Sequence, residues 1–340
     1  MSKRQLMMSN TMIAQDTRYI PAQPLCQVVV DICRSLGVAE HKLLRGTGIF
    51  EADIRDNGKV SVLQLAALLV NAEKLSGARE LGFLIGQALA TSHNKGFLNA
   101  LGYSRDLNQA LRLLSAFINQ VCSLVSFGEY RQGSARLFTF RDAAGHHKAF
   151  GIASMIVCSA MVSISKLWCG HRLPLTFHFP FSRPRHIAEF EMYLGRKLHF
   201  DSPCFSVTVS ENALVEPFSR ADSFLLMASV HHFAKTRKVG ALLPQIIRNM
   251  VTRNPQIAAL DVAQALDISP ATLKRKLKEC NTTFSALNDE VRREQAVFLL
   301  RICRLTNEQS ALNMAISDLT NFRRAVKRWT GRTPSELRGH

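Results

Sequence analysis

The feature that most constrains this chain is a basic amphipathic segment that occurs twice, 49 residues apart. The first copy is SPATLKRKLKEC (269–280), and the second lies within SDLTNFRRAVKRW (317–329). With about 100° of rotation per residue, apolar side chains fall on one side of each helix and cations on the other. The pattern therefore predicts two short helices, each with one buried face and one positive face.

The first of these helices also carries a start signal. Ser269 can accept a hydrogen bond from the open amide groups of a helix. Pro270 suits the first helical position because its missing N–H costs nothing there. The side chains expected to be buried are Leu273, Leu277 and Cys280 in the first helix and Phe322, Val326 and Trp329 in the second.

Small or polar residues and three cations lie on each outward face. A helix of this size fits the major groove of B-DNA, which is about 12 Å wide, where cations meet phosphates or guanine edges. The alternative is a pair of solvated basic faces on surface helices, and the repetition favours DNA. The candidate DNA-binding residues are Ala271, Thr272, Lys274, Arg275, Lys278, Thr320, Arg323, Arg324 and Lys327.

The segment before the first basic helix predicts a supporting helix. In residues 260–268, Val262, Ala263 and Leu266 recur at helical spacing, and a short turn leads to Ser269. A helix, a tight turn and a basic helix form a helix-turn-helix unit, in which the first helix braces the second in the groove.

Residues 284–302 predict a long helix that connects the two units. It would hold them about one DNA turn apart, roughly 34 Å, so that both basic helices enter successive major grooves. Arg292 and Arg293 on this helix are candidate phosphate contacts, as is Arg328. For the first two, ion pairs on the same helix are an equal alternative, with Asp289, Glu290 or Glu294 as partners.

Over residues 242–338 the sequence resembles the AraC/XylS family of bacterial transcription regulators. The motifs that carry the resemblance are VAQALDISPATLKRKL, TTFSALNDEVRREQAVFLL and SDLTNFRRAVKRWTGRTPSELR. The resemblance implies a cytoplasmic protein that joins the nucleoid when it binds double-stranded promoter DNA, and that contacts RNA polymerase if it is an activator. Activation and repression both remain open.

Two departures from the family pattern concern the helix-turn-helix units. The usual turn glycines are replaced by Asp267 and Ala315, of which Asp tolerates positive φ better. In the second unit, Asn307 and Ser310 stand where the family has apolar residues. We therefore expect the second supporting helix to be the less stable one, and to dock only on DNA or on a partner.

The first 240 residues predict an α+β domain. Helices are expected at 24–36, 62–75, 79–90, 107–125, 184–194 and 218–236. Alternating residues predict a hairpin at 127–141 across Gln132 and Gly133, and further strands at 174–179 and 205–209.

The stretch LPLTFHFPFSRPRHIAEFEMYLGRKLHFDSPCFSVTVS is similar to the effector-binding domain of an AraC subgroup with an arabinose-binding-type N-terminal domain. That similarity implies a small-molecule effector, without naming it, and leaves open a homodimer. The predicted architecture is an α+β N-terminal sensor domain followed by an all-α domain of two helix-turn-helix units joined by a long helix. The predicted divisions are a flexible leader (1–20), an effector-binding domain (21–236) and a DNA-binding domain (237–340).

Residues 149–165 form an uncharged run at the short edge of the range for a membrane span. Its four serines and its place between predicted strands favour a helix buried across the sheet instead. Such a helix would form the floor of a ligand cavity between it and the strands.

Charge and chemistry narrow the function further. The chain has 43 Lys and Arg against 26 Asp and Glu, a net charge of +17, which indicates polyanionic partners. Its eight cysteines form no CxxC pair and are expected to be reduced. Neither a catalytic set nor a cofactor motif is recognisable, and the adjacent histidines at 146–147 and 231–232 point apart on a regular element, so no enzyme, cofactor or metal is predicted.

Two functions of different classes follow. The first is a sequence-specific transcription regulator, and the alternative is an interaction protein that keeps the fold, acts mainly by contacting another regulator and binds DNA weakly without specificity.

Overall fold

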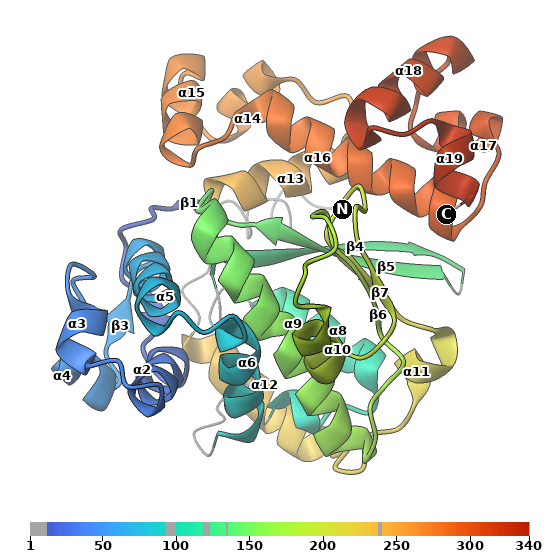
Figure 1. The fold of residues 1–340 in the computed structure, drawn as a ribbon. Helices are drawn as coiled ribbons and strands as arrows, with labels where there is room; N and C mark the ends of the chain where they lie inside the picture. Colours follow the sequence, from blue (N-terminus) through green and yellow to red (C-terminus); the bar gives the residue numbers. More distant parts are fainter. Residues whose placement is uncertain (1–11, 93–99, 118–122, 134, 237–239, 340) are drawn as a thin grey trace.

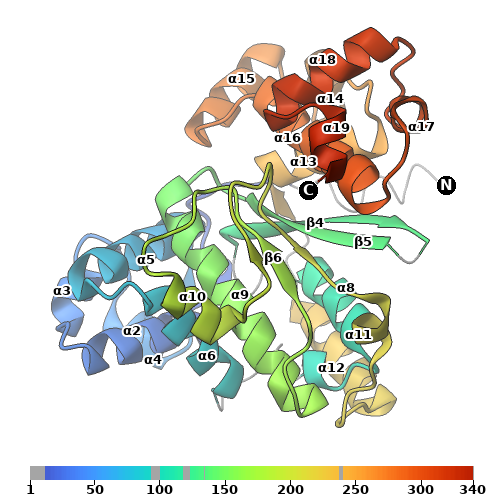
Figure 2. The ribbon, with the colours of Figure 1, turned by 45° about the vertical axis from the view of Figure 1, so that its right-hand side comes forward.

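The computed structural model describes residues 12–92, 100–117, 123–133, 135–236 and 240–339. Helices and a mixed sheet form the N-terminal part, and helices alone form the C-terminal part, which lies over the β4–β5 hairpin in both views (Figures 1 and 2). The α+β sensor domain and the all-α domain that follows it are therefore both present, as predicted.

Helices cover one side of the N-terminal domain. Three begin and end within a few residues of the predicted bounds, namely α2 (Leu25–Ser35), α5 (Val62–Ser76) and α6 (Leu81–Thr91). Two short helices, α3 (Glu40–Leu44) and α4 (Glu51–Arg55), were not predicted. The helix expected at 107–125 is shorter. α8 (Leu107–Phe117) is followed by residues outside the described part, and residue 125 already belongs to a strand, because the apolar run continues into the sheet.

The sheet has five strands in the order β4-β5-β8-β6-β7. Their bounds are β4 (Val125–Gln132), β5 (Ala135–Asp142), β6 (Thr176–His178), β7 (Leu198–His199) and β8 (Ser206–Thr208). The predicted hairpin is confirmed, with Phe127 opposite Phe140, and Gly133 at its turn has a φ of +56°. Between β6 and β7 lies α10 (Ile187–Leu194), also as expected, and β6 and β7 pair in parallel.

The long apolar helix α9 (His147–Cys169) lies in the core. It packs against α5 and α6 as well as against β4 and β5. Gly86 of α6 allows this close approach, because a Cβ there would lie 2.3 Å from the carbonyl oxygen of Ile156. α9 is long and apolar enough to span a membrane, but just over half of its apolar stretch is buried within the protein. The prediction of a buried helix is confirmed.

The predicted leader is wrong in its second half. β1 (Met12–Ile13) pairs in parallel with β9 (Ala241–Leu242), just before the C-terminal helices. β2 (Ile20–Pro21) pairs with β3 (Lys59–Val60), and Ile20 is fully buried. These short pairings use backbone groups, which a composition-based prediction does not detect. Residues 1–11 lie outside the described part.

Two helices end the N-terminal domain, α11 (Glu211–Val215) and α12 (Ser223–Thr236). α12 begins five residues later than predicted. The predicted domain boundary between residues 236 and 237 lies at the edge of a segment, 237–239, outside the described residues.

The C-terminal domain is a series of short helices around one long helix. Its elements are α13 (Leu243–Arg253), α14 (Ala259–Ala265), α15 (Pro270–Glu279), α16 (Phe284–Val297), the π-helical turn η2 (Phe298–Ile302), α17 (Asn307–Asn313), α18 (Leu319–Thr330) and α19 (Pro334–Gly339). α16 with η2 is the connecting helix predicted at 284–302. The pairs α14–α15 and α17–α18 are the two helix-turn-helix units.

Candidate nucleic-acid interface

The first recognition helix, α15, begins as its sequence predicts. Ser269 Oγ accepts a hydrogen bond from the amide of Thr272 at 3.1 Å. Leu273, Leu277 and Cys280 are buried, and the first two pack against Val262 of α14 among other residues. The inward face is therefore fixed by the core, which leaves the cations no orientation other than outward.

The candidate DNA-binding side chains of α15 are accessible. Thr272 is half-buried, with its hydroxyl 2.9 Å from that of Ser269, and the other four are exposed, namely Ala271, Lys274, Arg275 and Lys278. Arg275 forms an ion pair with Glu279 one turn further on, at 2.6 Å. Both partners are more than half exposed, so this ion pair contributes little to stability. Arg275 can therefore exchange Glu279 for another anion.

The second recognition helix, α18, repeats the arrangement with a different cap. The carboxylate of Asp318 accepts from the amide of Thr320 at 2.8 Å. Phe322 and Val326 are fully buried, and Trp329 donates from Nε1 to Asp289 of α16 at 2.9 Å. The four candidate residues are exposed on the opposite face: Thr320, Arg323, Arg324 and Lys327.

Both turns have the backbone conformation that glycine usually provides. Asp267 has a φ of +52° and Ala315 a φ of +54°. Asp adopts this left-handed region more readily than Ala, because its short polar side chain can bond locally. The turn of the second unit is therefore the more strained of the two.

The second supporting helix, α17, is packed in the free chain. Ala311 and Met314 are buried beside Phe322, so the expectation that this unit docks only on DNA or a partner is wrong. The apolar surface that α17 buries is nevertheless small. Ser310 is fully buried, its hydroxyl has no hydrogen-bond partner among the described residues, and Leu312 is 80% exposed.

The predicted phosphate contacts differ in accessibility. Arg292 is 7% exposed, and its guanidinium donates to the backbone carbonyls of Met314, at 2.8 Å, and of Pro255. It joins the turn of the second unit to the loop before α14, so both the phosphate contact and the alternative ion pair are wrong for Arg292. Arg293 is half-buried and donates to the carbonyl of Trp329, whereas Arg328 is exposed and pairs with Asp289 at 3.4 Å.

A buried ion pair fixes the connecting helix to the sensor sheet. Arg141 of β5 donates from Nε to both carboxylate oxygens of Glu294 on α16 at 3.0 Å, and the two side chains are 4% and 2% exposed. Tyr130 donates its hydroxyl to Glu294 at 3.0 Å and accepts from Arg141 at 3.1 Å. Burial alone would lower the pKa of Arg141, but Glu294 and Tyr130 outweigh it and raise that pKa. The sequence predicted none of these contacts.

The segment that ends α15 also contacts the sensor domain, at the backbone of Gly145. Asn281 Nδ2 donates to the carbonyl of Gly145 at 3.1 Å. Gly145 has a φ of +77°, and a Cβ there would lie 1.7 Å from the carbonyl oxygen of Cys280, so only glycine fits. α18 lies on the side of its domain away from the sensor sheet, whereas α15 stands at one end of that domain (Figures 1 and 2).

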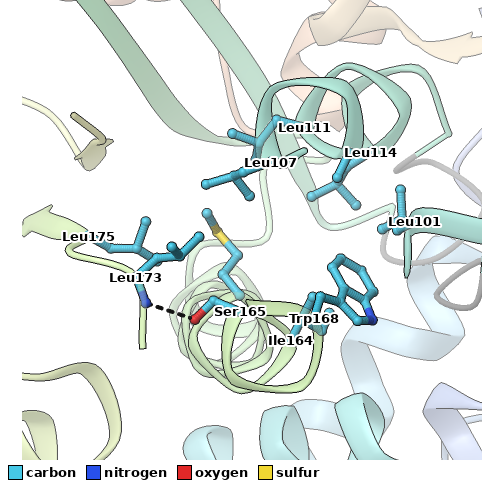
Figure 3. Close-up of a pocket in the computed structure, with 11 residues that line it drawn as sticks. Leu101, Leu107, Leu111, Leu114, Ile164, Ser165, Trp168, Leu173 and Leu175 are labelled. Atoms are coloured by element: carbon cyan, nitrogen blue, oxygen red, sulfur yellow. Dashed lines mark hydrogen bonds between the residues drawn. The ribbon is translucent and has the colours of Figure 1, made fainter. Parts of the chain in front are cut away.

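The sensor domain contains a small apolar cavity of about 30 Å³. It lies between α8 and α9, where Leu107, Leu111 and Trp168 surround it (Figure 3). Ser165 supplies the polar atom nearest the floor, but its hydroxyl accepts from the amide of Leu173 at 3.3 Å. α9 lines this cavity, but the predicted position between α9 and the strands is wrong, because the other walls come from α8 and the segment before β6.

The described residues include no cluster of three or more His, Cys, Asp or Glu that could hold a metal ion. His147 instead pairs with Asp142 at 3.0 Å, and His171 pairs with Glu216. Burial raises the pKa of Cys33 to about 11 and that of Cys26 to about 12, as expected for inert thiols.

Comparison with known proteins agrees with this architecture. Residues 37–218, more than half of the chain, match the family described as the N-terminal arabinose-binding domain of AraC transcription regulators. The chain belongs to the AraC family. Residues 262–340 match a helix-turn-helix domain family. This AraC-family protein is thus a DNA-binding transcription regulator with an arabinose-binding-like N-terminal domain, a class that does not consist of enzymes.

Individual relatives extend over different parts of the AraC-family chain. An ornithine utilization regulator of Pseudomonas aeruginosa is 24% identical over 326 residues, which are 92% of this chain and 94% of the relative. An uncharacterized helix-turn-helix-type transcriptional regulator of Mycobacterium tuberculosis is 45% identical over 76 residues, 22% of each chain. The crystal structure of the transcriptional regulator CdpR from Pseudomonas aeruginosa matches 76% of this chain and 86% of its own, with 20% identity and a TM-score of 0.34.

Proposed function

We propose that this AraC-family regulator inserts α15 and α18 into successive major grooves on one face of a promoter. The observation that supports this is the accessibility of the two repeated cationic faces, each opposite a buried apolar stripe. In α15, Arg275 reads a base and Lys278 contacts a phosphate. In α18, Arg323, Arg324 and Lys327 have no hydrogen bond or ion pair recorded within the described residues, and they meet the second groove.

Control by a small effector follows from the sensor domain. The cavity between α8 and α9 has an apolar lining, and none of its lining residues is acidic. Its volume of about 30 Å³ has room for about one water molecule, and it offers no carboxylate to an ammonium group, so this cavity does not suit ornithine, which the name of one relative mentions. The effector of this chain therefore has to be found by experiment. The protein acts in the bacterial cytoplasm, contacts RNA polymerase if it activates, and has an N-terminal domain that can also serve a homodimer.

The decisive experiment begins with selection of DNA from a random duplex library by the full-length protein. Gel shift at several stated salt concentrations then compares the selected site with a scrambled one. Arg275→Ala should cost about 1 to 3 kcal/mol at one base position, whereas Lys278→Ala should weaken binding to both DNAs and reduce the salt slope by about one.

A matched control is Lys74→Ala, which removes an exposed cation from α5 and should change neither the DNA affinity nor the salt slope. Equal losses on selected and scrambled DNA for both recognition-helix variants would contradict the assigned roles.

The alternative is an interaction protein that keeps the fold. Leu312, which is 80% exposed on the thin second supporting helix, is the observation that favours it. That function predicts no enrichment in the selection and only salt-labile binding to any DNA, while Leu312→Ser would abolish capture of a partner regulator.

A further inference from the structure

Four cationic or titratable groups meet where the outer strands of the sheet face the end of the connecting helix. We call His178, His199, Arg301 and Arg332 the interdomain cation cluster. The parallel register of β6 and β7 places His178 opposite His199, and their rings stack with centroids 4.9 Å apart at 13°. Arg301 lies in η2, and Arg332 follows α18, so the cluster joins the sensor domain to the second helix-turn-helix unit.

Arg301 lacks the partner that its position calls for. It is half-buried, and no hydrogen bond or ion pair of its guanidinium is recorded within the described residues. Burial lowers its pKa, and so does the nearby Arg332. Arg332 itself is held by a hydrogen bond to the carbonyl of Asp201 at 2.8 Å. The nitrogens of Arg301 still reach solvent, and a half-buried guanidinium next to another cation favours an anionic partner.

His178 has the same deficit. It is 5% exposed, its Nε2 lies 3.3 Å from the hydroxyl of Thr208, and its Nδ1 is buried without a hydrogen-bond partner. If the hydroxyl donates to Nε2, the proton sits on Nδ1 and needs an acceptor. Burial, Arg301 and His199 lower the pKa of His178 to about 3, so the ring is neutral and offers one N–H.

The neighbouring carboxylates are already engaged. Asp201 accepts from the hydroxyl of Ser182 at 2.7 Å, and Glu336 accepts from the amide of Thr333 at 2.6 Å. Glu294, one helical turn before η2, is taken by Arg141. The cluster thus combines the unpaired Nδ1 of His178 with positive charge, and no carboxylate of the described residues forms an ion pair with Arg301.

We propose that the interdomain cation cluster binds a small anion through its carboxylate or phosphate group, with Arg301 as the principal ligand. Guanidinium groups bind such groups in a bidentate manner, and the donor of His178 together with Arg332 would complete the site. The anion would connect β6 and β7 to η2 and so stabilise the contact between sensor and second unit. This inference rests on the proposed function, because it assigns the class of ligand that controls the regulator.

Isothermal titration of the full-length protein tests the site. The probes are inorganic phosphate and succinate, each at constant ionic strength against sodium chloride. Wild type should bind at least one of them saturably, and Arg301→Gln should raise the dissociation constant about tenfold or more. Arg304→Gln is the matched control, because it removes an exposed cation three residues away and should leave binding unchanged.

A second variant keeps the test valid if Arg301→Gln unfolds, as judged by circular dichroism. His199 is exposed on an edge strand, and His199→Gln should raise the dissociation constant about threefold. Absence of saturable binding of both probes to wild type would overturn the inference, as would equal affinities in wild type and Arg301→Gln.

Gel shift with the selected DNA separates this result from the proposed function. If Arg301→Gln weakens binding to all DNAs equally and leaves the affinity for free anions unchanged, the cluster contacts DNA phosphates instead, and the inference fails. Failure of the proposed function would show differently, as loss of DNA selectivity in wild type while phosphate or succinate still binds.

Discussion

The two helix-turn-helix units present the same cationic face but rest on different supports. The first unit packs on α13 and α16 in a cluster formed mainly by its own domain, with Leu273 and Val291 among its members. The second unit shares its core with the sensor domain, since Leu137 of β5 and Cys204 just before β8 pack with Phe298 and its neighbours. A change in the sensor sheet therefore reaches the second unit more directly than the first.

The ion pair between β5 and α16 should be the largest single contribution to that contact. Glu294→Ala leaves Arg141 buried and uncompensated, so we expect a loss of about 3 to 5 kcal/mol in the free energy of unfolding, measured in urea. The double variant Arg141→Met with Glu294→Met should stay within about 1 kcal/mol of wild type. Asp31→Ala, which breaks an exposed pair with Arg34, should cost less than about 1 kcal/mol. A small loss for Glu294→Ala would mean that the domains are not coupled here.

The two supporting helices can be compared at equivalent positions. Val262 of α14 and Ser310 of α17 are both fully buried 48 residues apart, and only the first is apolar. Val262→Ser should destabilise the first unit by about 2 to 3 kcal/mol, because it adds an unsatisfied hydroxyl and a cavity. Ser310→Ala should stabilise the second unit by about 1 kcal/mol, because it removes a buried hydroxyl that has no hydrogen-bond partner.

Native-state hydrogen exchange of amides in α14 and α17 reports each unit separately, which global unfolding of a two-domain chain does not. Faster exchange in α17 after Ser310→Ala would show that the serine hydroxyl has a partner that stabilises the fold.

The smallest expected difference between the two units lies in their turns. Ala315→Gly should raise the stability of the second unit by about 0.5 to 1 kcal/mol, because it removes the cost of a β-carbon at positive φ. Asp267→Gly should change the first unit by less than about half of that, since Asp tolerates this region. Native-state hydrogen exchange of the amides in α14 and α17 measures both stabilities. Ala325→Gly in the middle of α18 is the control and should destabilise by about 1 kcal/mol. Equal effects of the two turn variants would show that side-chain identity does not distinguish the turns.

Local patterns predicted the elements that local forces determine. The cap at Ser269, the buried stripe of Leu273 and Leu277, and the hairpin through Gly133 depend on residues within a few positions of one another. The prediction failed where distant groups compete for a side chain. Arg292 shows the difference, because nothing near it in sequence indicates that carbonyls of Pro255 and Met314 would bind it.

The sequence alone determined that this protein has two basic helices with fixed inner faces, an α+β domain before them and the family to which both belong. Only the tertiary structure decided how the two parts meet. Arg141 and Glu294 are 153 residues apart, and the charge of Arg301 lowers the pKa of His178 only after the sheet and the connecting helix have packed. Helical period and caps act through neighbouring residues, whereas buried charges find their partners only when folding brings distant segments together and excludes water between them.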